Sequence, residues 1–185
     1  NFVVGADGDK VSEITSAAAG GIRCSLDDML RWAGNWLTPD VKQRSWLSDE
    51  QRAAMWAPHT PMPISERRHA WDNTHAWLYA FGFRLGDVDG VWTVSHTGTL
   101  SGMYSMMMLL PDLKSGFVIL INGEADEART VLSEVLVKQF TAPEDGREVA
   151  EYAADLAQDR AEAGNSPTEQ ATARSPTQPS QLYGK

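Results

Sequence analysis

The chain has 185 residues, of which 42% are hydrophobic and 22% are charged, as in an ordinary globular protein. Its 16 Lys and Arg residues against 25 Asp and Glu residues give a formal net charge of −9. An acidic chain repels phosphate backbones and anionic lipid surfaces, so we expect no nucleic-acid partner and no binding to membrane surfaces. Cys24 is the single cysteine, which excludes an intrachain disulfide, and no apolar run is long enough to predict a membrane span.

The first third of the sequence predicts a loop followed by two helices. Residues 1–21 are small and polar and end in a glycine pair, which predicts a loop with a tight turn. Ser25, with a carboxylate three residues later, is typical of a helix start, and apolar residues follow at helical spacing until Pro39. Ser48, with an amide three residues later, begins a second, shorter helix that ends before Pro58.

The middle of the sequence predicts an exposed loop and then four strands. Residues 58–73 contain three prolines and several charges without a period, which indicates a surface loop. We expect residues 78–85 and 91–97 to form one hairpin, and residues 103–110 and 116–122 to form a second. The last two strands are apolar at successive positions, so both faces of an antiparallel sheet must be covered by helices.

The last third predicts helices and a linker, and it completes an α+β fold class in which helices flank both faces of an antiparallel sheet. Residues 128–140 carry apolar side chains at helical spacing and predict a covering helix. We expect three units: a main domain over 1–141, a trailing helix within 142–164, and a Ser-, Thr- and Pro-rich linker over 165–185.

The most distinctive stretch is residues 95–103, SHTGTLSGM, where a predicted strand ends at a glycine-punctuated turn. A lone histidine at a strand end is more often structural than catalytic, and both glycines can be simple turn residues. However, HTG followed by Gly-Met, a Met-rich strand and a Pro-Asp turn is similar to the third motif of serine β-lactamases and penicillin-binding proteins. That motif is usually KTG, and the esterase and D-aminopeptidase branches often carry His in place of Lys.

Three other segments resemble the same family, in its class C β-lactamase-related, CubicO-like esterase and peptidase branch, and they occur in the family's order. They are AGGI with SLDDM at 19–29, YAFGF at 79–83, and FVILIN at 117–122. The resemblance implies the C-terminal part of a β-lactamase/transpeptidase-like fold. Residues 179–185 also resemble the opening of a small β-rich domain that follows some of these hydrolases, so we expect the linker to lead into a truncated domain of that kind.

The resemblance also implies roles for the HTGT residues. His96, Thr97 and Thr99 would be catalytic: His96 would replace the Lys beside the nucleophile, and Thr99 would donate its backbone N–H to the oxyanion. Thr97 and Gly98 would bind substrate, Thr97 through its hydroxyl and Gly98 by leaving the strand edge bare. The implied substrate is a small-molecule or peptide ester or amide. We expect no cofactor and no metal, because the histidines elsewhere fit no zinc spacing and no second cysteine exists.

The sequence lacks the family's nucleophile, because no serine has Lys three residues later, and Tyr-x-Asn is also missing. In the family both motifs precede the glycine turn found here near Gly20. We therefore expect the C-terminal fragment of a serine hydrolase that cleaves an ester, amide or β-lactam through an acyl-enzyme. Alone, without its N-terminal half, this fragment would be inactive and prone to self-association. Family habit favours the bacterial periplasm or cell envelope.

Two alternatives remain open: a non-catalytic binding or sensor protein with the same fold, and an unrelated α+β domain in which HTG occurs by chance. Tryptophans at helical spacing, such as Trp36 and Trp56, favour core packing over a ligand surface. Trp71 and Trp77 flank the predicted loop and either line a substrate cleft or pack in the core. We expect Cys24 to be a small buried residue.

Overall fold

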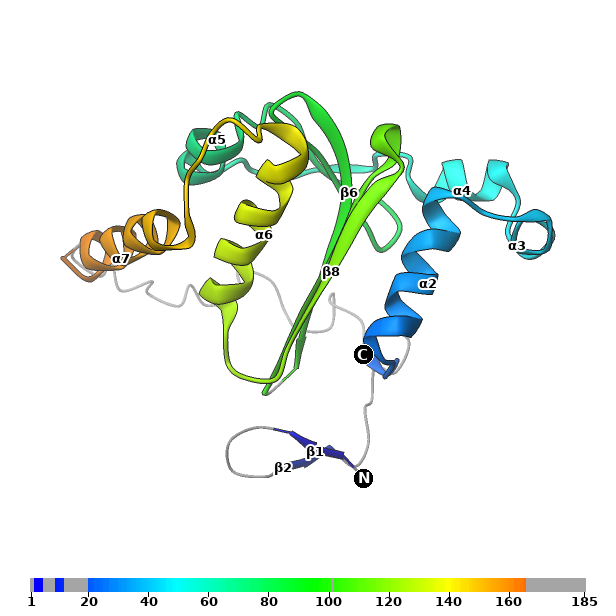
Figure 1. Ribbon diagram of the computed structural model, residues 1–185, viewed down its shortest axis with the longest axis horizontal. Helices are drawn as coiled ribbons and strands as arrows, with labels where there is room; N and C mark the ends of the chain where they lie inside the picture. Colours follow the sequence, from blue (N-terminus) through cyan, green and yellow to red (C-terminus); the bar gives the residue numbers. More distant parts are fainter. Residues whose placement is uncertain (1, 5–8, 12–19, 101, 166–185) are drawn as a thin grey trace, which may run out of the picture.

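The computed structural model describes residues 2–4, 9–11, 20–100 and 102–165. Its centre is a six-stranded antiparallel sheet in which the strands follow one another in chain order, from β3 to β8 (Figure 1). The strands are β3 (Thr60–Pro61), β4 (Trp77–Tyr79), β5 (Arg84–Val88), β6 (Val91–Leu100), β7 (Met103–Leu110) and β8 (Ser115–Ile121). A short 3-10 turn, η1 (Pro111–Leu113), joins β7 to β8.

Helices cover both faces of this sheet, which confirms the predicted α+β class. Helix α2 (Leu26–Leu37) lies against one face and α6 (Asp126–Thr141) against the other (Figure 1). The core under α2 is built from Ala33, Trp36, Ala80, Phe83, Leu85, Val94, Met107 and Leu109, and Trp56 packs against it. The core under α6 is built from Val88, Met108, Leu110 and Val137. Strand β7 contributes to both cores, which explains its unbroken apolar run.

Local capping chemistry sets the helix starts on the α2 side. Ser25 caps α2, and Ser48 caps α4 (Asp49–Met55); each forms a reciprocal capping box, so both predicted starts are confirmed. A further helix, α3 (Val41–Trp46), was not predicted. It begins at a third capping box, from Asp40 to Gln43, and its six residues are too few to show an apolar period.

The predicted N-terminal loop is wrong where the structure describes it. Strands β1 (Phe2–Val4) and β2 (Asp9–Val11) pair with each other, with Val3 opposite Lys10. The rest of residues 1–19, including most of the loop prediction, lies outside the described residues. Three-residue strands show too little alternation to be distinguished from a polar loop.

The predicted surface loop over 58–73 is also wrong. It contains β3 and helix α5 (Glu66–Asp72), which is capped by Ser65. Trp71 is 6% exposed because it packs edge-on against Tyr152 of helix α7 (Val149–Asn165). The partner that buries this helix is more than 80 residues away in sequence, so no local pattern could have indicated it.

Two strand boundaries differ from the prediction. The expected strand 78–85 is two paired strands, because Gly82 adopts a φ of 74° and turns the chain from β4 back into β5. Strand β6 continues to Leu100, three residues past the predicted end, so HTGT lies wholly inside the strand rather than at its end. The covering helix and the trailing helix are present as α6 and α7, whereas the predicted linker lies almost wholly outside the described residues. In the part of the chain that the structure covers, no helix is both long and apolar enough to cross a membrane.

Candidate active site

The hairpin turns at the two ends of β6 determine where its backbone groups point. Asp89 and Gly90 both have positive φ and connect β5 to β6 in a two-residue turn closed by the pair Val88 and Val91. The residues beside such a turn form a hydrogen-bonded pair, and the pairing alternates along the ladder. Val91 and every second residue after it therefore direct their N–H and C=O groups toward β5. The pair Leu100 and Met103 at the other end gives the same alternation toward β7.

Within the part of the chain that the structure describes, the last five residues of β6 have a strand partner on only one side. Pairing with β5 stops at Ser95, opposite Arg84, whereas pairing with β7 continues to Leu100. By the alternation, the main-chain groups of Thr97 and Thr99 face the side of β6 from which β5 is absent. Those of His96 and Gly98 face β7. Among the described residues, the HTGT segment thus forms a strand edge that no neighbouring strand covers.

His96 is half-buried beside this edge. Its Nε2 atom lies 3.0 Å from the hydroxyl of Tyr79, and the two rings meet edge-on. Burial lowers the pKa of His96 from its ordinary value, and the positive charge of Arg84 lowers it further, against an opposing backbone hydrogen bond at Thr97. The imidazole is therefore neutral at pH 7 and can exchange a proton with a hydroxyl group rather than act as a fixed charge.

Replacing Arg84 with glutamine is expected to raise the pKa of His96, because it removes a nearby positive charge that disfavours the imidazolium. Titration of the His96 ring protons by NMR measures this pKa directly. R160Q is the control, because it removes an Arg from the exposed surface of α7. An unchanged His96 pKa in R84Q would show that burial alone sets it.

Thr97 is held by Arg84, whose Nη1 donates to the Thr97 hydroxyl oxygen at 2.7 Å. The hydroxyl accepts in this bond, so its own hydrogen is available to a ligand. A Cβ atom at Gly98 would lie 2.3 Å from the hydroxyl oxygen of Ser105 on β7. The absence of a side chain at Gly98 therefore makes room for Ser105 on the neighbouring strand. The predicted contact of Gly98 with substrate stays a prediction.

Thr99 and Gly98 are held from the α6 side. Nη1 of Arg129 donates to the Gly98 carbonyl oxygen and to the Thr99 hydroxyl oxygen, both at 2.9 Å. At the tip of the hairpin, the Glu124 carboxylate accepts from the Gly102 N–H at 2.6 Å. The guanidinium groups of Arg84 and Arg129 therefore donate to three consecutive residues of HTGT.

The structure brings the four predicted residues together and adds three that sequence reasoning did not assign. Tyr79 lies within a segment used for the resemblance, but its contact with His96 depends on the turn at Gly82. Arg84 stands opposite Ser95, two residues from Thr97 on β6, so a correct strand boundary could have indicated it. Arg129 reaches the site from 30 residues away, and no local signal marks it.

The amino-acid sequence of this chain matches a known protein family. A family model described as Beta-lactamase matches residues 2–141, which is more than half of the chain and includes the whole sheet. The chain belongs to the beta-lactamase family. No curated protein matches it. Family membership supports hydrolase chemistry of the serine β-lactamase type, and it overturns the alternative of an unrelated domain.

Other candidates in this beta-lactamase-family chain belong to packing. Trp71 is buried and donates to Asp155 at 2.8 Å, and the guanidinium of Arg68 lies 4.0 Å above the Trp77 ring. Trp71 therefore joins α5 to α7, and Trp77 of β4 packs under Arg68 of α5. Cys24 is exposed, so the expectation of a buried thiol is wrong; it precedes the α2 cap and faces solvent. Within the described residues, no group of three His, Cys, Asp or Glu side chains could hold a metal ion.

Proposed function

We propose that this chain supplies one wall of the active site of a serine hydrolase that works through an acyl-enzyme. His96, Thr97, Gly98 and Thr99 form this wall. The nucleophile stands in a Ser-x-x-Lys motif outside these 185 residues, so the chain alone is inactive. The observation that carries the proposal is the open edge of β6, where the main-chain groups of Thr97 and Thr99 face outward beside a neutral imidazole.

Each residue of the wall has a chemical role in this proposal. The Thr99 N–H stabilises the oxyanion of the tetrahedral intermediate, and one such donor contributes roughly 3 kcal/mol to lowering the barrier. The Thr97 hydroxyl, with its oxygen occupied by Arg84, donates to a polar group next to the scissile carbonyl. His96 and Tyr79, joined by their hydrogen bond, relay a proton between the serine and the leaving group.

The lowered pKa of His96 favours ester or peptide substrates over β-lactams. A Lys at this position carries a permanent positive charge that attracts an anionic substrate, whereas a neutral His does not. We therefore expect the active protein to be an esterase or peptidase of the CubicO-like, bacterial branch. Turnover of nitrocefin by that protein far above its turnover of simple esters would contradict this assignment.

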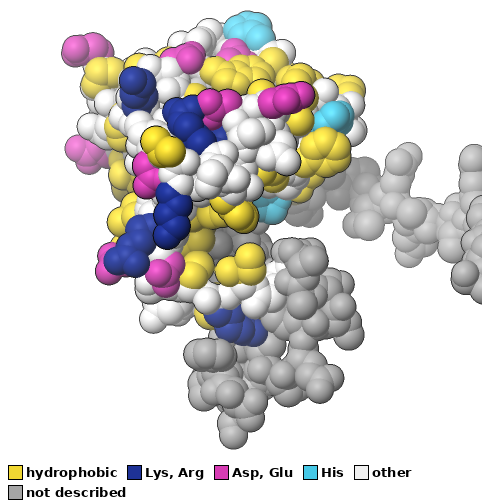
Figure 2. All heavy atoms as spheres, turned by 90° about the vertical axis from the view of Figure 1, so that its right-hand side faces the viewer, with side chains coloured by type: hydrophobic (Ala, Val, Ile, Leu, Met, Phe, Trp, Pro, Cys, Tyr) yellow, Lys and Arg dark blue, Asp and Glu magenta, His cyan; other side chains and the backbone are white. Residues whose placement is uncertain are grey.

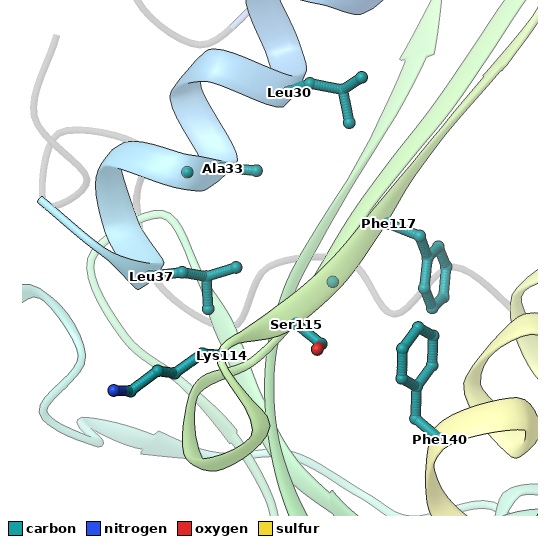
Figure 3. Close-up of a pocket in the computed structure, with 9 residues that line it drawn as sticks. Leu30, Ala33, Leu37, Lys114, Ser115, Phe117 and Phe140 are labelled. Atoms are coloured by element: carbon teal, nitrogen blue, oxygen red, sulfur yellow. The ribbon is translucent and has the colours of Figure 1, made fainter.

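The surface near β8 supports the proposed partner, a further segment of the same protein. Among the described residues, β8 pairs only with β7. Beside it lies a groove of about 300 Å³, with Leu30 and Leu37 of α2 on one side of the strand and Phe117 and Phe140 on the other (Figure 3). Hydrophobic side chains also reach the surface among the charged ones on the side of α2, α3 and α4 (Figure 2). Packing of the serine-bearing segment here would bury this apolar surface.

Covalent labelling tests the proposal. The 185-residue chain and a longer polypeptide from the same gene are treated with a fluorescent penicillin and a fluorophosphonate, and adducts are detected by intact mass. We expect no adduct on the 185-residue chain and one adduct on the longer polypeptide, at the serine of Ser-x-x-Lys. A gene that encodes no Ser-x-x-Lys would favour the non-catalytic binding protein, which keeps the open edge as a ligand site. An adduct on the 185-residue chain alone would place the nucleophile elsewhere.

A pair of Thr99 variants in the longer polypeptide separates the backbone role from the side chain. T99P removes the N–H that faces the open edge, where no strand bond is lost. T99V keeps this N–H and removes only the hydroxyl. We expect kcat of T99P to fall about 10²- to 10³-fold below that of T99V. Equal rates in the two variants would exclude an oxyanion donor at residue 99.

A further inference from the structure

Arg129 makes two hydrogen bonds to the HTGT segment from the side opposite the open edge, and the proposed function gives these bonds no role. Arg129 lies near the start of α6, and its side chain is 10% exposed. Its Nη1 donates to Gly98 O and to Thr99 Oγ1, and Nη2 pairs with Asp126. The guanidinium also lies 5.0 Å from the centre of the Tyr104 ring. A buried cation with this many contacts is fixed in place and converges on one peptide group.

That peptide group joins the Gly98 carbonyl to the Thr99 N–H. The bond is trans, as are all peptide bonds in the described residues, so its C=O and N–H point in opposite directions. A donor on the Gly98 oxygen therefore fixes the direction of the Thr99 N–H toward the open edge. The positive charge of the Arg129 guanidinium beside that oxygen also draws electron density from the amide nitrogen, which makes the Thr99 N–H a stronger donor.

The Gly98 carbonyl oxygen has a hydrogen-bonding partner on β7 even without Arg129. Gly98 stands opposite Ser105, and the alternation of the ladder places its backbone groups on the β7 side. A carbonyl has two lone pairs, so the contact with Arg129 is additional to the pairing of the strand. The hydroxyl of Tyr104, which stacks under the guanidinium, is bonded to Glu124, and Glu124 also holds the hairpin tip. Arg129, Tyr104 and Glu124 therefore all lie on the side of the Gly98–Thr99 peptide that is opposite the open edge.

We infer that Arg129 is a positioning residue for the oxyanion site: it orients and polarises the Gly98–Thr99 peptide so that the Thr99 N–H donates into the open edge of β6. The inference rests on the proposed function for its catalytic meaning. Its structural half, the polarised amide, belongs to this chain whether or not a nucleophile is present. Arg129 touches no reacting atom and acts through the peptide alone.

NMR of the 185-residue chain tests the structural half. In R129M we expect the Thr99 amide proton to move upfield, because the bond that polarises its peptide is lost. The Thr97 amide is the internal reference, since it faces the same edge and no guanidinium of the described residues donates to the preceding carbonyl of His96. R129K keeps the charge without the fork of donors and is expected to move Thr99 by less. A Thr99 amide that moves no more than Thr97 in both variants would overturn the inference.

Kinetics of the longer, serine-containing polypeptide test the catalytic half. We expect R129M to lower kcat about 10-fold or more with KM little changed, because the interaction strengthens only as the oxyanion forms. R160M, which removes an exposed Arg of α7 that pairs with Glu127 of α6, is the control and should keep both constants. A lower kcat without the Thr99 shift would mean that Arg129 acts otherwise. If the shift occurs and no longer polypeptide has hydrolase activity, the proposed function fails while the polarised peptide stands. Should R129M not fold, R129K carries both measurements.

Discussion

Replacing Arg52 with methionine is expected to lower the free energy of unfolding by about 3 to 5 kcal/mol, because several buried acceptors lose their donor at about 1 to 3 kcal/mol each. Arg52 lies in α4 and is 6% exposed. It donates to Asn35 O at 2.8 Å, to Asn35 Oδ1 at 2.9 Å, to Leu47 O at 2.9 Å and to Gln43 O at 3.3 Å. It also lies 5.2 Å from the Trp36 ring centre. One side chain thus joins α2, α3 and α4.

Urea denaturation followed by circular dichroism measures this loss. R31M is the control, because Arg31 is exposed on α2 and its removal should cost less than about 0.5 kcal/mol. The double variant R52M/N35L removes the acceptor amide together with the donor and should recover part of the stability. If R52M were no less stable than R31M, the bonds made by Arg52 would contribute nothing net to the folded state.

The elements that the sequence predicted correctly are those fixed by neighbouring residues. A capping box is complete within four residues, so the starts of α2 and α4 followed from Ser25 and Ser48. The consecutive apolar residues of β7 and β8 must be buried on both faces of the sheet, so the helix–sheet–helix layers followed from this pattern alone. The missed helix α5 is the opposite case: Trp71 becomes a core residue only because α7 returns to cover it.

The candidate site divides in the same way. The HTGT motif lies in one continuous strand, so the sequence could place its four residues together. Tyr79, Arg84 and Arg129 come from three other elements, and their contacts with the motif depend on strand register and on where α6 packs. These contacts give the motif its chemistry, because they set the pKa of His96, occupy the oxygen of Thr97 and hold the peptide of Thr99. A motif therefore predicts the location of a site better than its electrostatics.

Replacing Glu134 with glutamine is expected to stabilise the protein at neutral and alkaline pH. Glu134 of α6 is 7% exposed and is hydrogen-bonded to the carboxyl of Asp72, which is 1% exposed. Burial, followed by the hydrogen bond and the charge of Asp72, raises the pKa of Glu134 to about 10, against the opposing charges of Arg68 and Lys138. The folded protein therefore keeps a proton that the unfolded chain releases above its ordinary pKa of 4.5.

The sign of the pH dependence follows from this proton. Stability from the protonated Glu134 is complete below about pH 4.5 and is lost as the pH rises toward about 10, at up to roughly 1.4 kcal/mol per pH unit. The amide of E134Q cannot ionise and can replace the protonated carboxyl as the donor to Asp72. We expect the variant to gain about 3 kcal/mol or more over the unsubstituted chain by pH 8, because it lacks the fall in stability that Glu134 causes as the pH rises from about 5 to 8.

Urea denaturation at a series of pH values distinguishes this effect from a simple loss of negative charge. E127Q removes a carboxylate from the exposed surface of the same helix, so it should leave the pH dependence of unfolding as it is. Parallel pH profiles for E134Q and the unsubstituted chain would mean that Glu134 is ionised in the folded state and is compensated by Arg68 and Lys138. A flattened profile for E134Q alone would show that the Asp72–Glu134 pair holds a proton under α6. Two buried acids, Asp72 of α5 and Glu134 of α6, can lie in contact only while one of them keeps its proton. This contact helps to hold α6, the helix that carries Arg129, against α5.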